Sequence, residues 1–170
     1  MKPTSKQELQ EIIEDTIDKK GNKCDLNFID VSLITDMGYL FYDIDFKGDI
    51  SKWNVSNVEN MNGMFKESTF NGDISKWNVS KVENMSFMFA YSKFNGDISN
   101  WNVSKVEDMS FMFAYSKFNG DISNWNVANV RYKTFLFVNT LLEENPPEWC
   151  CAKNQPERQH NPLDIFKEFL

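Results

Sequence analysis

The stretch that decides the fold is Phe70–Lys93, FNGDISKWNVSKVENMSFMFAYSK. Phe94–Lys117 repeats it with two changes, and the same 24-residue frame covers 46–69 and 118–141 without an insertion. A degenerate copy covers 22–45. A fixed period of this length is typical of a solenoid, in which each unit buries its apolar face against its neighbours. We therefore predict a solenoid of 24-residue coils.

Two secondary-structure elements are predicted within each coil. Trp77 and Val79 alternate with a polar residue, which favours a short strand over residues 76–79 with both side chains buried. Ser80 precedes Glu83 by three residues, and this capping box predicts the start of a short helix. The predicted fold class is therefore α/β, with short parallel strands on one face of the solenoid and short helices on the other.

Both ends of the repeat region are expected to be capped. Residues 4–20 show apolar residues at helical spacing, among them Leu9 and Ile13, so residues 1–21 are predicted to form an N-terminal capping helix that Gly21 ends. Residues 142–170 leave the repeat and are predicted to form a C-terminal cap. A solenoid needs such caps because its terminal coils would otherwise expose the core to water.

The segment FNGDISKWNVSKVENMSFMF resembles the repeat of the BspA-type leucine-rich-repeat family, a domain of unknown function in mycoplasmas that is abundant on the surfaces of oral and gut bacteria. The resemblance covers about residues 22–141. It implies a right-handed solenoid related to leucine-rich repeats, and binding or adhesion as the role of the chain.

Charge is distributed unevenly along the chain. The formal net charge is −7, yet residues 46–141 carry ten basic and nine acidic residues and are nearly neutral. The acidity lies in residues 22–45 and 142–170. Direct binding of nucleic acid is not expected, because phosphate binding needs a dense basic surface.

The sequence also bears on the compartment. No run of about 18 apolar residues is present, so no membrane span is expected. The first residues are charged, unlike a secretory signal, and the three cysteines make a poor disulfide framework. We expect a cytoplasmic protein for the chain as written, and a cell-surface protein if a leader has been removed.

Neither a cofactor nor catalytic chemistry is predicted. The aspartate series could suggest calcium, but each coil offers one carboxylate where calcium needs six or more oxygens, and an aspartate after glycine more often accepts from its own turn. The series is Asp25, Asp49, Asp73, Asp97 and Asp121. The single histidine, His160, lies far in sequence from the repeated serines, so no enzyme is expected.

The candidate binding residues lie on the outward face of the predicted strands. They are Lys52, Asn54, Lys76, Asn78, Asn100, Asn102, Asn124 and Asn126. Neighbouring parallel strands would stack the asparagines into a ladder. Such a ladder is explained equally well by amides that stabilise the sheet and by a surface that binds a partner.

These patterns favour a non-enzymatic interaction module that binds another protein through the sheet face or through its acidic ends. One alternative is a bacterial surface adhesin-type repeat protein. The other is a small acidic intracellular inhibitor, encoded by a mobile element, that occupies a basic groove of its target.

Overall fold

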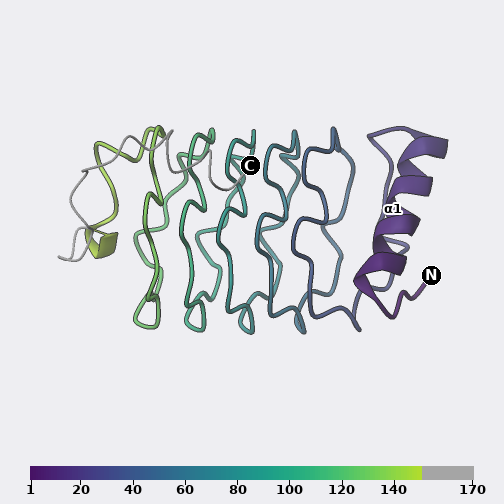
Figure 1. Ribbon diagram of the computed structural model, residues 1–170, viewed down its shortest axis with the longest axis horizontal. Helices are drawn as coiled ribbons and strands as arrows, with labels where there is room; N and C mark the ends of the chain where they lie inside the picture. Colours follow the sequence, from purple (N-terminus) through teal and green to yellow (C-terminus); the bar gives the residue numbers. More distant parts are fainter. Residues whose placement is uncertain (151–170) are drawn as a thin grey trace.

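The computed structural model describes residues 1–150 of the protein. Figure 1 shows a row of stacked coils, with the α-helix α1, Lys6–Lys20, at one end and the short 3-10 helix η1, Glu148–Cys150, at the other. Parallel backbone bridges join residues that stand 24 apart, as in Asp36 with Asn60 and Asn84 with Asp108. The coils thus follow the repeat of the sequence, and each pairs with the coil or coils next to it.

The predicted α/β leucine-rich-repeat-like architecture is wrong. Within residues 1–150, α1 and η1 are the only helices, and the parallel pairing consists of isolated bridges instead of strands. The coils are built from consecutive tight turns. Neither a layer of parallel strands nor a layer of helices covers the stack in the described part of the chain.

The backbone of residues 60–68 shows why the coil is neither strand nor helix. The N–H groups of Met61, Gly63, Phe65 and Glu67 donate to carbonyls of the next coil, at 2.8–2.9 Å. Between them, the N–H groups of Met64 and Lys66 donate three residues back and close turns, at 3.2 Å and 3.0 Å, and the Asn62 N–H donates to Asn60 Oδ1. Because every second N–H bonds outside its own coil, neither a continuous helical pattern nor an extended strand can form.

The predicted capping box at Ser80 is also absent. The Ser80 N–H donates to Asn78 Oδ1 at 3.2 Å, and the Glu83 N–H donates to the Glu59 carbonyl of the preceding coil at 2.8 Å. Val82 closes a turn onto the Val79 carbonyl at 3.0 Å. A Ser-x-x-Glu spacing is therefore present without the helix that it usually begins.

The core consists of aromatic columns that run along the stack. One column holds the phenyl rings at the end of each turn segment, with neighbouring centroids 5.5–5.8 Å apart. Its members are Phe41, Phe65, Phe89, Phe113 and Phe137. A second column holds the phenylalanine that opens each repeat, with centroids 6.0–6.4 Å apart. Its members are Phe46, Phe70, Phe94 and Phe118.

The repeated tryptophans form a third buried column, which confirms their predicted place in the core. Trp77 is 4 % exposed, and its indole N–H donates to the Ile50 carbonyl of the preceding coil at 3.2 Å. Trp149 continues the column beyond the last full repeat, because its ring stacks on Trp125 at 6.4 Å and its N–H reaches the Ile122 carbonyl at 2.9 Å. The repeat thus extends structurally as far as η1.

Helix α1 lies on the first coil. Ser5 Oγ accepts from the Glu8 N–H at 3.2 Å, and Gly21, with a φ of 82°, ends the helix. Leu9 and Ile13 are fully buried in the main core. No helix among the described residues is long and apolar enough to cross a membrane.

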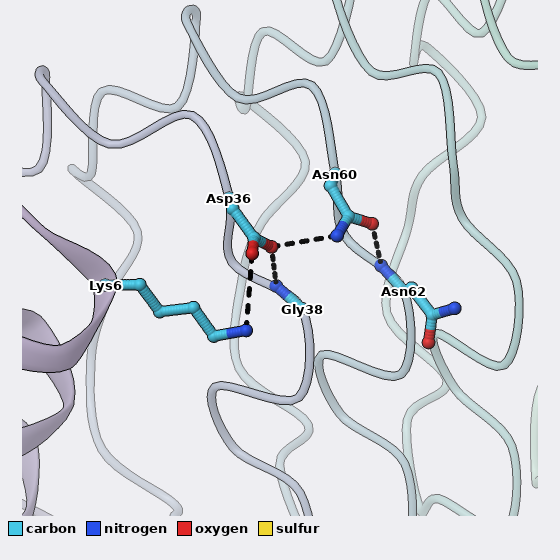
Figure 2. Close-up of polar contacts among 5 residues, drawn as sticks. All are labelled: Lys6, Asp36, Gly38, Asn60 and Asn62. Carbon is cyan, nitrogen blue, oxygen red and sulfur yellow. Dashed lines mark hydrogen bonds and ion pairs between the residues drawn. The ribbon is translucent and has the colours of Figure 1, made fainter.

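A polar chain fastens α1 to the stack, as Figure 2 shows. Asp36 Oδ2 accepts from the Lys6 ammonium of α1 at 3.4 Å, and Asp36 Oδ1 accepts from the Gly38 N–H at 2.7 Å. The Asn60 amide of the next coil donates to the same Oδ1 at 2.9 Å, and its own oxygen accepts from the Asn62 N–H. One carboxylate therefore links the helix, its own turn and the following coil.

Candidate functional site

A second apolar cluster lies outside the main core, on the outer side of the coils. Phe111 and Ala114 are its buried centre, and partly exposed side chains pack around them. Those side chains are Phe87, Tyr115, Phe135 and Val138. Tyr91 stacks on Tyr115 beside this cluster. Lys66 connects Phe87 to Tyr42 of the first coil, and Tyr39 packs edge to face on Tyr42. We call this surface, from Tyr39 to Val138, the outer aromatic face.

Most of these aromatic residues sit on a left-handed backbone. Each coil has two such positions, and each is the third residue of a tight turn, where type II geometry demands a positive φ. Phe87, Tyr91 and Phe111 have φ values of 57°, and Tyr115 has 56°. Bulky residues rarely adopt this conformation, which costs about 1–3 kcal/mol at each position.

Other coils show that the turns do not need aromatic residues. At the Phe87 position, the coil of residues 46–69 has Gly63. At the Tyr91 position, the last repeat has Asn139, with a φ of 55°. Glycine and asparagine adopt this backbone more readily than any aromatic residue. The aromatic side chains are therefore not explained by the turns that carry them.

From one middle coil to the next, the rings of the outer aromatic face stack more closely than the phenyl rings within each core column, whose centroids are 5.5–6.4 Å apart. The Phe87 and Phe111 centroids are 4.8 Å apart with an angle of 7° between the rings, and Tyr91 and Tyr115 have the same two values. Because the flat sides contact each other, the middle coils present mainly ring edges to the outside. Tyr91 remains 37 % exposed.

Lys66 lies inside this face with its ammonium group between aromatic rings. The nitrogen is 5.2 Å from the Tyr42 ring centre and 6.0 Å from that of Phe87, which belong to the preceding and following coils. Glu67 Oε1 lies 3.5 Å away, and the Lys66 side chain is 7 % exposed. The two rings and the carboxylate together offset the loss of hydration of the buried ammonium.

The binding residues predicted from the sequence form exposed rows, but not on a sheet. All eight, from Lys52 to Asn126, are exposed. Four of the six asparagines accept through Oδ1 from the backbone N–H two residues on, at 3.2 Å: Asn54, Asn78, Asn102 and Asn126. These bonds stay within each coil. The predicted ladder of stacked amides between coils is therefore replaced by separate turns.

The carboxylates of the aspartate series also accept from the backbone N–H two residues on. Asp49 Oδ1 accepts from the Ser51 N–H at 2.8 Å, and equivalent bonds of 2.8–2.9 Å recur from Asp25 to Asp121. The Ser51 N–H lowers the pKa of the Asp49 carboxyl, since the bond favours the charged form. In residues 1–150, no group of three or more histidine, cysteine, aspartate or glutamate side chains could hold a metal ion.

The acidic ends are partly engaged in structure. Asp45 binds Lys47 and also accepts from Asn22 and Thr69, and these bonds lower the pKa of its carboxyl to about 2, with the Lys47 contact as the largest cause. Glu143 accepts from the Asn139 N–H at 2.7 Å. Asp43, Glu144 and Glu148 are exposed. His160 and Cys151 lie outside the described residues, Cys24 is a buried free thiol, and Cys150 is buried.

The period alone does not predict the outer aromatic face. Spacing of three and four residues suggests a helix, and a helix would distribute these aromatic residues between its buried and exposed sides. The sequence does contain one indication of this face, which is the change of residue type at equivalent positions of successive repeats. Gly63 gives way to Phe87 and Phe111, and Glu67 gives way to Tyr91 and Tyr115, while the core positions keep their chemistry.

The comparison with protein families assigns the chain to a family. The model of the family described as "Mycoplasma protein of unknown function, DUF285" matches residues 7–114 and 90–158, and the chain belongs to this family. Two overlapping matches agree with the repeated coils. The leucine-rich-repeat part of the resemblance is not supported, because the described coils lack its strands and helices. Neither the comparison with curated proteins nor that with solved structures gave a match.

Proposed function

We propose that the protein is a non-enzymatic interaction module that binds another protein through its outer aromatic face. The observation that carries this proposal is the choice of aromatic residues at left-handed positions. Phe87, Tyr91, Phe111 and Tyr115 hold a strained backbone that glycine or asparagine adopts more easily. Strain of this kind is concentrated where a protein uses the side chains for function.

The arrangement of the rings supports a protein partner over a sugar or a nucleobase. Sugars and bases stack on the flat sides of aromatic rings, and in the middle coils those sides already contact the neighbouring ring at 4.8 Å. Ring edges and tyrosine hydroxyls suit the mixed apolar and polar surface of a protein. Tyrosine is enriched at the centres of such interfaces for this reason.

The rows of exposed lysine and asparagine form the competing surface. Four of their six asparagines hold turns through Oδ1, so half of the eight candidate residues have a structural role that explains their recurrence. The outer aromatic face has no comparable explanation in its own turns. We therefore favour the aromatic face over the rows as the binding surface.

A capture experiment with matched variants tests the proposal. The chain serves as bait in a lysate of the organism that encodes it, and bound proteins are quantified by mass spectrometry. Tyr91→Asn/Tyr115→Asn places at both positions the residue that stands at 139, so the turns remain favourable. We expect this variant to stay folded, with a free energy of unfolding within about 1 kcal/mol of the wild type, and to lose the partner.

Lys52→Asn/Lys76→Asn is the control for the competing rows, because asparagine stands at the equivalent positions 100 and 124. This variant should retain the partner. Circular dichroism and urea unfolding check that both variants are folded. Retention of the partner by a folded Tyr91→Asn/Tyr115→Asn variant, with loss in the lysine variant, would assign binding to the rows and reject the aromatic face.

A further inference from the structure

We propose that the first-coil end of the outer aromatic face binds lysine or arginine side chains of a basic segment of the partner. This inference rests on the proposed function, which it deepens by naming the chemistry of the partner. The binding residues are Tyr39 and Tyr42, with Asp43 and Glu67 as the acidic groups beside them. Asp43 follows Tyr42 directly in the sequence and is exposed.

The protein already contains one contact of the proposed kind. The Lys66 ammonium lies 5.2 Å from the centre of the Tyr42 ring and 3.5 Å from a Glu67 oxygen. Its position between rings of two different coils shows that this surface accommodates a cation with an aromatic contact and a carboxylate contact together. Lys20 shows a similar preference, with its nitrogen 5.3 Å from the ring centre of Phe28, also in the first coil.

The first-coil end is also the most open part of the face. Tyr39 and Tyr42 are 45 % and 40 % exposed, whereas Phe111 in the middle is 6 % exposed. The two tyrosine rings meet edge to face at 5.8 Å, instead of in the parallel stack of the later coils. A partner cation can therefore approach a tyrosine ring here, while the middle coils offer it mainly ring edges, which repel positive charge.

Charge complementarity selects a basic partner over an acidic or neutral one. Residues 22–45 contain five aspartates and one lysine, while residues 46–141 are nearly neutral. Asp43 is exposed and stands in the same column as Glu67. Asp30, Asp36 and Asp45 pair with Lys2, Lys6 and Lys47, so the carboxylates beside the tyrosine rings are those of Asp43 and Glu67. These two groups would steer and hold a lysine- or arginine-rich segment.

Binding of oligolysine and oligoarginine to the full chain, with oligoglutamate as the charge control, tests the inference. Dissociation constants are measured by calorimetry at low and at physiological salt. Tyr39→Leu/Tyr42→Leu keeps the net charge and the apolar bulk but removes the π-faces. Loss of two cation–π contacts should raise the dissociation constant for oligolysine about tenfold. Oligoglutamate should not bind.

The matched control removes charge without touching the aromatic face. Glu11→Gln/Glu14→Gln neutralises two exposed carboxylates on α1, and it should change the dissociation constant for oligolysine less than threefold. An unchanged dissociation constant in the tyrosine variant, or a loss in the α1 variant as large as that of the tyrosine variant, overturns the inference and leaves only non-specific attraction.

A second measurement uses the wild-type chain and does not depend on the stability of a variant. Titration with oligolysine should shift the backbone NMR signals of Tyr39, Tyr42 and Asp43 first. Shifts centred on the aspartate row from Asp49 to Asp121 would contradict the proposal. If the Tyr91/Tyr115 variant loses the cellular partner while the Tyr39/Tyr42 variant binds oligolysine normally, only this inference fails; the reverse result rejects the proposed function as stated.

Discussion

Each tryptophan of the stack fills the core and also ties two coils together through its ring nitrogen. Trp77 stacks on Trp53 at 6.5 Å and donates to the Ile50 carbonyl at 3.2 Å. A buried indole without a partner for its N–H would be destabilising, so the turn that positions the Ile50 carbonyl and the tryptophan depend on each other. Single substitutions in this column should therefore affect more than one coil.

Trp77→Ala should lower the free energy of unfolding by about 3–5 kcal/mol, the usual range for a large aromatic residue in a core. Trp77→Phe keeps most of the apolar contact and loses the hydrogen bond, so its loss should be smaller, about 1–2 kcal/mol. Urea unfolding followed by circular dichroism measures both. Equal losses in the two variants would show that the hydrogen bond, and not the packing, dominates.

The Asp45 carboxyl makes the free energy of unfolding depend on pH in the acidic range. Its pKa in the folded chain is about 2, below the value of about 3.9 for an unfolded aspartate. Between these values the unfolded chain binds more protons, so the stabilisation is fully present above about pH 4 and is lost as the pH falls towards 2. Asp45→Asn should flatten this part of the curve of unfolding free energy against pH.

The contribution of Asp45 is measured by urea unfolding between about pH 2 and pH 6. The row from Asp49 to Asp121, whose pKa values are also lowered, will leave some acid dependence in the Asp45→Asn variant. Asp18→Asn, on the exposed side of α1, is the control and should leave the curve unchanged. Identical curves for the wild type and Asp45→Asn would contradict the assigned role.

At the scale of the element, the tight turn replaces the helix and the strand as the building block. Asn78 accepts the Ser80 N–H and so closes the turn that follows Trp77, whereas no helix begins at the Ser80 hydroxyl. Asn78→Ala should therefore lower the free energy of unfolding by about 1 kcal/mol. Ser80→Ala should change it by less than about 0.5 kcal/mol.

The same two substitutions distinguish a turn closed by Asn78 from a helix capped by Ser80. In a helix that began at Ser80, the serine variant would lose about 1 kcal/mol and the asparagine variant almost nothing. Urea unfolding of the two single variants gives the order directly. A larger loss for Ser80→Ala than for Asn78→Ala would contradict the turn structure described above.

The sequence predicts the period, the buried residues and the end helix because these depend on apolar spacing. Trp77 and Val79 are both buried, as expected. Apolar spacing does not reveal how the backbone between them satisfies its hydrogen bonds. Spacing of three residues fits a helix and a series of i to i−3 turns equally well, and only the left-handed positions, such as Phe87, distinguish them. The outer aromatic face depends on these positions and is therefore missed.

For the whole molecule, contact between neighbouring coils is the main source of stability. The coils of residues 70–93 and 94–117 differ at two positions, so either should fit against the neighbours of the other. Deletion of 94–117 should give a folded, shorter stack with a lower free energy of unfolding and a smaller m-value, because less surface is buried. Urea unfolding measures both quantities.

Deletion of residues 94–105 is the control, because it removes half a repeat. It would place core residues of one half-coil against exposed residues of the other and should abolish cooperative unfolding. A folded half-repeat variant, or an unfolded full-repeat variant, would contradict the view that registry between coils determines the structure.

The backbone bonds between coils, such as Met61 to Asn84 at 2.9 Å, join residues about one repeat apart, and this has a consequence for synthesis on the ribosome. Within residues 1–150 the backbone bonds between coils join neighbouring coils, so the contact order of this part is low and its folding should be fast. The capping helix α1 is made before the coils. Translation at about 5–20 residues per second then delivers a complete coil every few seconds, and each can settle on the one before it.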